Sequence, residues 1–318
     1  MASPVFTYQI KDTNHTSKKI IVIAGPTAVG KTAVAIEIAK QLNSVILSAD
    51  SRQCYRELNI GVARPSPQEL KSVPHYFIAS HSIHENIGAA FYEKYALDIL
   101  QQLFKQHNTV VVTGGTGLYI KALVDGLDEI PEVPGPVRAA IIKNYEENGI
   151  SWLQEQLQIK DPLFFSQGEM QNPQRMMRAL EVREATGQSI ISYRKTTKAY
   201  RDFSIKQFAL EMPREMLNER INKRVDIMML AGLEAEAKSL WHYRHLNALQ
   251  TVGYKEMFEY FDGKINLQNT KELIQQNTRR YAKRQMTWFK KQANIHWIDA
   301  SAEPDAKTLA TAILDMSA

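Results

Sequence analysis

A short apolar run followed by a glycine-rich loop and a helix constrains this chain more than any other feature. Residues 20–24 (IIVIA) read as a buried strand, and residues 31–42 have the character of a helix. Between them the pattern G-x-x-x-x-G-K-[ST] is satisfied by Gly25, Pro26, Thr27, Ala28, Val29, Gly30, Lys31 and Thr32. In this context the glycines let backbone N–H groups surround oxyanions, and the helix N-terminus adds positive potential. We therefore expect a polyphosphate-binding loop, called here the phosphate loop (residues 25–32).

Two side chains of the phosphate loop have expected roles. Lys31 supplies a positive charge to a terminal phosphate, and the hydroxyl of Thr32 is a ligand for Mg²⁺. The motif does not specify a reaction, because nucleoside kinases, ATPases and other transferases share it. ATP or another nucleotide therefore remains a possible ligand at this point, and a glycine turn without function is the weaker alternative.

The remaining strand and helix patterns predict an α/β fold. The strand-like segments are short and rich in β-branched or aromatic residues, and they cover residues 20–24, 45–48, 76–79, 110–113, 205–211 and 296–299. Helical patterns at 31–42 and 89–106 separate the early strands, and further helical patterns at 214–240 and 271–291 precede the last strand. This alternation indicates a P-loop NTPase-like parallel sheet flanked by helices.

A proline-rich segment interrupts this alternation. Residues 128–141 (DEIPEVPGPVRAAI) contain three prolines and a glycine, as linkers do. From residue 137 to about 198 the chain reads as helical, with Asn172 as an N-cap and Pro173 in the first turn of one helix. We expect a flexible tail at 1–18, a catalytic core formed by 19–130 and 200–318, and an inserted all-helical domain at 131–199.

Composition indicates where in the cell the protein is expected to be found. No stretch approaches the ~20 apolar residues that span a bilayer, and the polar N-terminus lacks the apolar part of a secretory signal. The single cysteine, Cys54, excludes a disulfide within the chain and a thiolate zinc cluster. We expect a cytoplasmic, monomeric protein without a membrane partner, in which Cys54 is a partly buried small residue and not a nucleophile.

The positive charge is concentrated in one segment. The net charge is +5, and residues 271–295 hold seven basic residues and one acidic residue, which is +6 and leaves −1 for the rest. Such a segment suits a polyanionic partner such as a nucleic acid. A solvated helix face would have the same composition, so charge alone leaves both interpretations open.

Two further loops follow predicted strands. Asp50 comes directly after the segment at 45–48, and Gly114, Gly115, Thr116 and Gly117 (the GGTG loop) follow the segment at 110–113. Ligands of open α/β sheets bind at the carboxyl ends of the strands, so we expect both loops to face the phosphate loop. Asp50 suits a general base or a water-mediated Mg²⁺ ligand, with a turn carboxylate as the alternative.

Eight ordered blocks together resemble the bacterial tRNA dimethylallyltransferases, also called isopentenyl-tRNA transferases. The blocks are GPTAVGKT, SADSRQCYRELNIGVARP, VPHYFI, GGTGLYIKAL, NPQRMMRALEV, RINKRVDIMMLAGLEAEA, TVGYKE and AKRQMTWFKK, and the resemblance runs from about residue 20 to residue 299. The resemblance implies transfer of a dimethylallyl group from dimethylallyl diphosphate to N6 of the adenosine 3′-adjacent to the anticodon in tRNA. It also implies release of diphosphate, assistance by Mg²⁺ and flipping of the target base. In that case the phosphate loop holds the diphosphate of the substrate, and the partner is a tRNA anticodon stem-loop.

The resemblance also assigns catalytic residues. Asp50 matches the family's catalytic aspartate, and Thr27 and Thr116 match its substrate-orienting threonines. For a further basic residue at the diphosphate we expect Arg224, with Arg220 as second choice. Ordinary surface charge is the alternative for this i,i+4 pair.

The same resemblance assigns residues to tRNA. The matching positions are Asp50, Ser51, Arg52, Gln53, Arg138, Gln174, Arg175, Met176, Met177, Arg178, Gln250, Gly253, Tyr254, Lys255, Lys283, Arg284, Gln285, Trp288 and Lys290. Core packing is the alternative that we favour for the rings of Trp288 and Phe289. Val29 stands where the family often has serine, and Tyr76 replaces the second histidine of a common PHH block.

Three other functions fit parts of the pattern. A prenyltransferase acting on free AMP, ADP or ATP needs no large RNA surface, and a P-loop kinase has no use for the basic segment at 271–295. A non-catalytic RNA-binding ATPase is the third. Labelled dimethylallyl diphosphate, offered with and without tRNA, distinguishes them.

Overall fold

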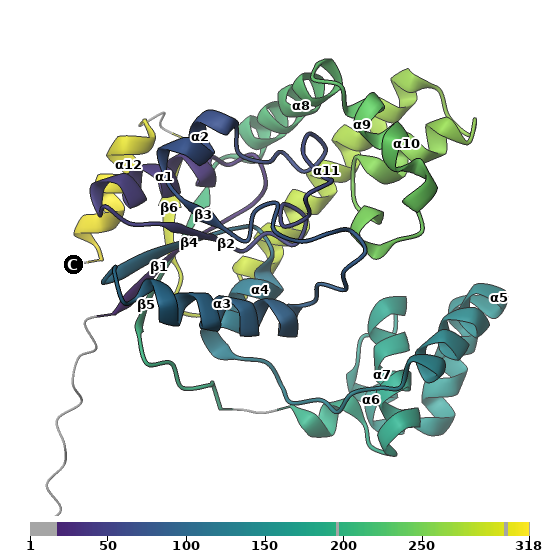
Figure 1. Ribbon diagram of the computed structural model, residues 1–318. Coiled ribbons are helices and arrows are strands. Elements are labelled where there is room, and N and C mark those ends of the chain that lie inside the picture. The colour runs from purple at the N-terminus through teal and green to yellow at the C-terminus, as the bar shows by residue number, and fades with distance from the viewer. Residues whose placement is uncertain (1–17, 195–196, 302–304, 318) are drawn as a thin grey trace, which may run out of the picture. The chain divides into compact units, whose positions relative to one another are not determined.

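The computed structural model describes residues 18–194, 197–301 and 305–317 (Figure 1). The chain forms two compact units, one made of residues up to Val124 together with those from Tyr200 onward, the other of Asp125–Ala199. The second unit begins six residues before the expected insertion at 131–199. No helix among the described residues is long and apolar enough to cross a bilayer.

The larger unit is built on a six-stranded sheet in which every neighbouring pair is parallel. Its strands are β1 (Lys19–Ala24), β2 (Ile46–Ser48), β3 (His75–Tyr76), β4 (Thr109–Thr113), β5 (Ser204–Glu211) and β6 (His296–Asp299). They follow the order β3-β2-β4-β1-β5-β6. The expected P-loop NTPase-like α/β fold is confirmed.

The register of the sheet brings three loops to one edge. Ser48 of β2 pairs with Thr113 of β4, and Thr113 pairs with Ile23 of β1. These three neighbouring strands therefore end at the same level. The phosphate loop, the loop that begins with Asp50 and the GGTG loop all leave the sheet side by side.

Alternating side chains divide the core between the two faces of the sheet. Ile20 and Val22 of β1 belong to one apolar cluster, and Ile21 and Ile23 belong to the other. The second cluster includes residues of α1 (Lys31–Gln41), α8 (Arg214–Leu230) and α12 (Ala306–Asp315). The first cluster includes residues of α3 (Ala89–Leu103), α4 (Gly117–Asp125), α9 (Leu233–Leu240), α10 (Tyr254–Phe261) and α11 (Leu267–Phe289). The short helix α2 (Pro67–Ser72) begins with a capping box formed by Ser66 and Glu69.

Two predicted elements end earlier than expected. The strand expected at 76–79 stops at Tyr76, because Phe77 (φ 62°) and Ala79 (φ 48°) adopt left-handed backbone conformations that no strand accommodates. The helix expected over 214–240 is broken at Gly232, whose φ of 101° separates α8 from α9. Helices α10 and α12 were not predicted from the sequence.

The smaller unit, Asp125–Ala199, is entirely helical apart from its loops (Figure 1). It contains α5 (Gly135–Lys160, kinked at Gly149), α6 (Pro162–Gln167), α7 (Pro173–Thr186) and the short 3₁₀ helix η1 (Ile190–Tyr193). As predicted, Asn172 caps α7, where its side chain accepts a hydrogen bond from the N–H of Arg175. The core of this unit includes Leu153, Leu157, Phe164, Met176 and Leu180.

Candidate active site

The phosphate loop turns sharply between β1 and α1. Gly25 has a φ of 134°, and a Cβ there would lie 2.7 Å from the carbonyl oxygen of Leu210, so only glycine fits. Gly30, with a φ of 108°, is the N-cap of α1. The N-terminus of an 11-residue helix therefore points its free N–H groups toward the carboxyl edge of the sheet.

Lys31 lies at the first position of α1 and turns back into the loop. Its Nζ donates a 2.6 Å hydrogen bond to the carbonyl of Pro26. Burial, followed by the positive charge of Arg224, lowers the pKa of Lys31 to about 7, although the carboxylate of Asp50 opposes this shift. A bound polyanion would reverse the effect, because an adjacent negative charge favours the protonated amine.

Two arginines of α8, Arg220 and Arg224, lie next to the phosphate loop. Nη1 of Arg224 lies 3.5 Å from the hydroxyl of Thr27, at the limit of a hydrogen bond. Burial, and then the like charge of Arg220, lower the pKa of Arg224. Both arginines line the same cavity as Lys31, which favours the anion-binding interpretation over ordinary surface charge.

Asp50 is both a turn carboxylate and a lining residue of the cavity, so it fits both interpretations given in the sequence analysis. Its Oδ1 accepts hydrogen bonds from the backbone N–H groups of Arg52 (2.8 Å) and Gln53 (3.2 Å), as a turn carboxylate does. Both bonds end on one oxygen, and Asp50 also lines the cavity with Lys31 and Thr32. The turn therefore orients the carboxylate without occupying all of it.

The GGTG loop packs closely on the segment that carries Asp50. A Cβ on Gly114 would collide with the backbone of Ala49, so glycine permits this approach. The hydroxyl of Thr116 accepts a 3.0 Å hydrogen bond from the N–H of Ser51 and lies 3.2 Å from its Oγ. Gly114 and Gly115 line the cavity, whereas Thr116 is not among its lining residues. In this structure Thr116 positions Ser51, a lining residue of the cavity, and its substrate-orienting role stays a prediction.

These loops and helices enclose one cavity of about 730 Å³. Its polar lining includes Thr27, Lys31, Thr32, Asp50, Ser51, Arg52, Gln53, Arg220, Arg224, Lys255, Arg284 and Gln285. Val225, Met228, Val252, Leu273 and Ile274 add apolar surface. A volume of this size, with one anion-binding end and an apolar wall, can hold a substrate larger than a diphosphate alone.

Tyr281 lines the cavity and was missed from the sequence. Burial and the nearby charge of Asp50 raise the pKa of Tyr281 to about 12, and its interaction with Thr116 opposes this shift. The side chain is therefore a neutral phenol at physiological pH. Its position one turn before Gln285 and two turns before Trp288 is the helical spacing that could have indicated a shared face.

Several residues expected to contact tRNA are exposed. Arg138, Gln174, Arg175, Gln250, Lys255, Lys283, Arg284 and Lys290 are exposed, and Asp50, Ser51, Arg52, Gln53, Arg178 and Trp288 are partly so. Arg52 donates to the carbonyls of Asn247 and Ala248, and Gln53 donates to those of Val62 and Ala63. Their side chains therefore hold the loop that presents Asp50.

Five expected tRNA-contacting residues are buried: Met176, Met177, Gly253, Tyr254 and Gln285. Met176 and Met177 belong to the core of the helical unit. The hydroxyl of Tyr254 donates a 2.6 Å hydrogen bond to Glu236, which also accepts the N–H groups of Ile60 and Gly61. Gly253 and Gln285 nevertheless line the cavity that holds Lys31, whereas the side chains of Met176, Met177 and Tyr254 pack in the interior. Their contact with tRNA stays a prediction.

Three further side chains, those of Trp288, Phe289 and Cys54, were expected to be partly or fully buried. Phe289 is fully buried and Trp288 packs against the same core, as we favoured for both rings. Cys54 is fully buried rather than partly, and burial together with the charge of Asp50 raises the pKa of its thiol to about 12. Such a thiol is a poor nucleophile.

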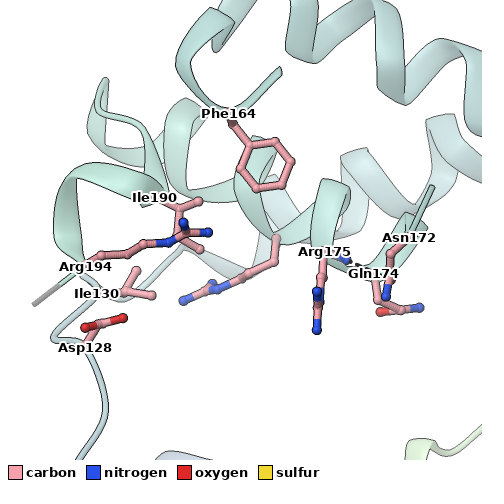
Figure 2. A pocket seen from close by; sticks show the side chains of 9 residues that line it. Asp128, Ile130, Phe164, Asn172, Gln174, Arg175, Ile190 and Arg194 are labelled. Carbon is pink, nitrogen blue, oxygen red and sulfur yellow. Dashed lines mark hydrogen bonds between the residues drawn. The ribbon is translucent and has the colours of Figure 1, made fainter. Parts of the chain in front are cut away.

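The helical unit has a pocket of its own, with a volume of about 410 Å³ (Figure 2). Arg194, Ile130 and Asp128 lie at one end of the view, and Arg175, Gln174 and Asn172 lie at the other. Arg178, Phe164 and Ile190 complete the lining. Three guanidinium groups beside an apolar wall suit a phosphate with an attached planar group.

One buried carboxylate holds two arginines of this unit. Glu181, only 3% exposed at its side chain, lies 3.3 Å from Nη1 of Arg178 and 3.7 Å from Nε of Arg138. Arg178 lines the pocket, and Arg138 is mostly exposed. The arginine planes are thus oriented before any partner binds.

The sheet and its phosphate loop define a P-loop-type α/β protein with a helical insertion. A family model described as IPP transferase matches residues 53–292, well over half of the chain. The chain belongs to the IPP transferase family.

Named relatives agree with this membership. A tRNA dimethylallyltransferase from Cytophaga hutchinsonii is 44% identical over 281 residues, covering 88% of this chain and 92% of the relative. A tRNA dimethylallyltransferase from Flavobacterium johnsoniae is 46% identical over 292 residues, covering 90% and 94%.

Solved structures are similar over nearly the whole chain. The crystal structure of a tRNA isopentenylpyrophosphate transferase from Bacillus halodurans has a TM-score of 0.69 at 32% identity and covers 94% of this chain and 96% of its own. A eukaryotic dimethylallyltransferase acting on tRNA has a TM-score of 0.76 at 25% identity, covering 94% and 79%.

Proposed function

We propose that this enzyme transfers a dimethylallyl group from dimethylallyl diphosphate to N6 of the adenosine 3′-adjacent to the anticodon in tRNA. The observation that carries the proposal is the single cavity in which Lys31, Arg224 and Asp50 meet. An anion-binding loop and a carboxylate in one cavity suit a reaction that expels diphosphate and removes a proton.

The reaction needs both the anion-binding loop and the carboxylate, because adenine N6 is a weak nucleophile and diphosphate leaves with negative charge. The lone pair of adenine N6 is delocalised into the ring, so the amine is a weak nucleophile. As the N6–carbon bond forms, the carbon–oxygen bond breaks, and its electron pair leaves on diphosphate. The N6 proton passes to the carboxylate of Asp50, while Lys31 and Arg224 stabilise the charge that develops on the leaving group.

The polar residues of the cavity also fit a Mg²⁺ ion. Thr32 and Asp50 line it, and among the described residues no group of three or more His, Cys, Asp or Glu could hold a metal by itself. Mg²⁺ commonly takes one or two protein oxygens and completes its shell with substrate phosphates and water. When bound, it would neutralise charge on the diphosphate.

The exposed cations supply an RNA-binding surface on each unit. On the larger unit these are Lys255, Lys283, Arg284 and Lys290. On the helical unit Arg178 lines the arginine-lined pocket, and Glu181 holds both Arg178 and Arg138. Guanidinium groups can contact phosphates or stack on unpaired bases, as single-stranded loops of RNA allow.

A transfer assay tests the proposal. Purified enzyme receives labelled dimethylallyl diphosphate and Mg²⁺ with an unmodified anticodon stem-loop, with the same stem-loop lacking the target adenosine, or with ATP or AMP alone. The proposal expects label only in the first RNA. Label in free nucleotide instead indicates a nucleotide prenyltransferase, and ATP hydrolysis or phosphate transfer without prenylation indicates a kinase or an ATPase.

A further inference from the structure

We propose that Gln285 is a positioning residue through which helix α11 holds the shape of the phosphate loop; this inference rests on the proposed function. Its side-chain amide bridges two loops that are far apart in the sequence. The N–H of Thr27 donates a 2.9 Å hydrogen bond to Oε1 of Gln285, and Nε2 donates a 2.9 Å hydrogen bond to the carbonyl of Gly115. Gln285 is only 7% exposed.

The bridge requires an amide. Thr27 offers a donor and Gly115 offers an acceptor, so one side chain must accept at one atom and donate at the next. Glutamate could accept from Thr27 but could not donate to Gly115, and methionine of similar length could do neither. Without the bridge, a backbone donor and a backbone acceptor would lose their partners at the edge of the cavity.

Neighbouring turns of α11 make related contacts on the same face. Tyr281, one turn earlier, interacts with Thr116. Trp288, nearly one turn later, packs so closely that a Cβ on Gly117 would collide with its ring. The inner face of α11 therefore holds the GGTG loop along its length, and Gln285 extends this contact to the phosphate loop.

The same helix carries exposed cations directly beside Gln285 in the sequence. Lys283 and Arg284 are exposed, and Arg284 also lines the cavity. RNA held by these cations and a diphosphate held by the phosphate loop are thus both connected to helix α11. We infer that the two ligands bind more tightly together than apart and that Gln285 carries much of this coupling, which must be reciprocal.

The test replaces Gln285 with methionine in the full chain. Calorimetry with inorganic diphosphate and Mg²⁺, without RNA, should show affinity weakened by about tenfold or more, because two buried hydrogen bonds are lost. Affinity for the anticodon stem-loop, measured without diphosphate, should stay within about twofold of wild type. Gln276→Met makes the same substitution at an exposed position of α11 and should change neither affinity.

A second variant reaches the bridge from its other side. A Cβ at Gly115 would meet Nε2 of Gln285, the movable end of a flexible side chain, so Gly115→Ala should displace the amide. It should weaken diphosphate binding as Gln285→Met does, and the double variant should be no weaker than either alone. This variant also carries the test if Gln285→Met does not fold.

Different failures point to different conclusions. If Gln285→Met weakens RNA binding and leaves diphosphate affinity unchanged, Gln285 is an RNA contact and the inference is wrong. Wild-type coupling that survives unchanged in both variants also overturns it. If wild-type enzyme binds diphosphate but never prenylates RNA, the proposed function fails, while the binding comparison still decides the role of Gln285.

Discussion

The lowered pKa of Lys31 predicts that diphosphate binding weakens as pH rises. In the free protein, burial and Arg224 lower the pKa of Lys31 to about 7. A bound diphosphate favours the charged amine, so binding draws a proton whenever the pH lies above that value. The sign follows directly: affinity is retained below the pKa of the free enzyme and is lost progressively above it.

The size of the effect follows from the two protonation states. Above the pKa, each further pH unit makes protonation of the free enzyme about 1.4 kcal/mol less favourable, which is tenfold in affinity. Between about pH 7.5 and about pH 9, where the diphosphate ester itself is fully ionised, the dissociation constant should rise roughly 20-fold. At about pH 8.5, binding should take up about one proton.

Calorimetry measures both quantities. Titrations in two buffers of different ionisation enthalpy, at fixed Mg²⁺, yield the proton uptake together with the affinity. Lys31→Arg is the matched control, because a guanidinium stays protonated throughout this range and should remove the pH dependence. Asp50→Asn should move the onset to lower pH, since the charge of Asp50 raises the pKa of Lys31.

One result would refute this reasoning. A wild-type dissociation constant that is constant across this range, with no proton uptake, means that Lys31 is already charged in the free enzyme. The cavity would then be more hydrated around Lys31 than the structure indicates.

Three further outcomes follow from the site. Asp50→Asn keeps an oxygen that accepts from the N–H groups of the turn but removes the base. Single-turnover prenylation should therefore slow by roughly 10²–10⁴-fold, with RNA affinity preserved. Near-normal turnover in this variant excludes Asp50 as the base. Replacing the exposed Lys283 and Arg284 with glutamine should reduce the slope of log affinity for RNA against log salt by about 1 to 2, and an unchanged slope means that these cations do not meet phosphates. At about pH 8, a thiol reagent should label Cys54 in the native protein roughly 10³-fold more slowly than in the unfolded chain, because a thiol with a pKa of about 12 is almost entirely protonated. Rapid labelling of the native protein would show that the loop around Cys54 opens readily.

Local patterns predicted much of the fold. The phosphate loop is a contiguous motif whose strand, turn and helix follow from short-range preferences, and each lies where it was expected. Asn172 and Pro173 begin α7 for equally local reasons. The predictions were wrong at 76–79 and around Gly232. In both places the backbone changes direction at single residues with positive φ, and no longer sequence pattern indicates the change.

Contacts between distant segments could not be predicted in this way. Gln285 lies 258 positions after Thr27, and no periodicity indicates that its amide meets the N–H of that residue. Resemblance placed Met176 and Tyr254 within RNA-contacting blocks, but burial depends on what packs over a residue, and both are in the core.

The sequence by itself determined the phosphate loop, the parallel α/β class and the concentration of positive charge in one segment, because each is a property of neighbouring residues. The sequence also predicted that the Asp50 and GGTG loops face the phosphate loop, but only the tertiary structure decided which side chains line the cavity. The register that aligns Ser48, Thr113 and Ile23 brings Asp50 beside Lys31, and the packing of α11 adds Tyr281 and Gln285. Such proximity depends on strand pairing and helix packing over long sequence separations, which no local pattern encodes.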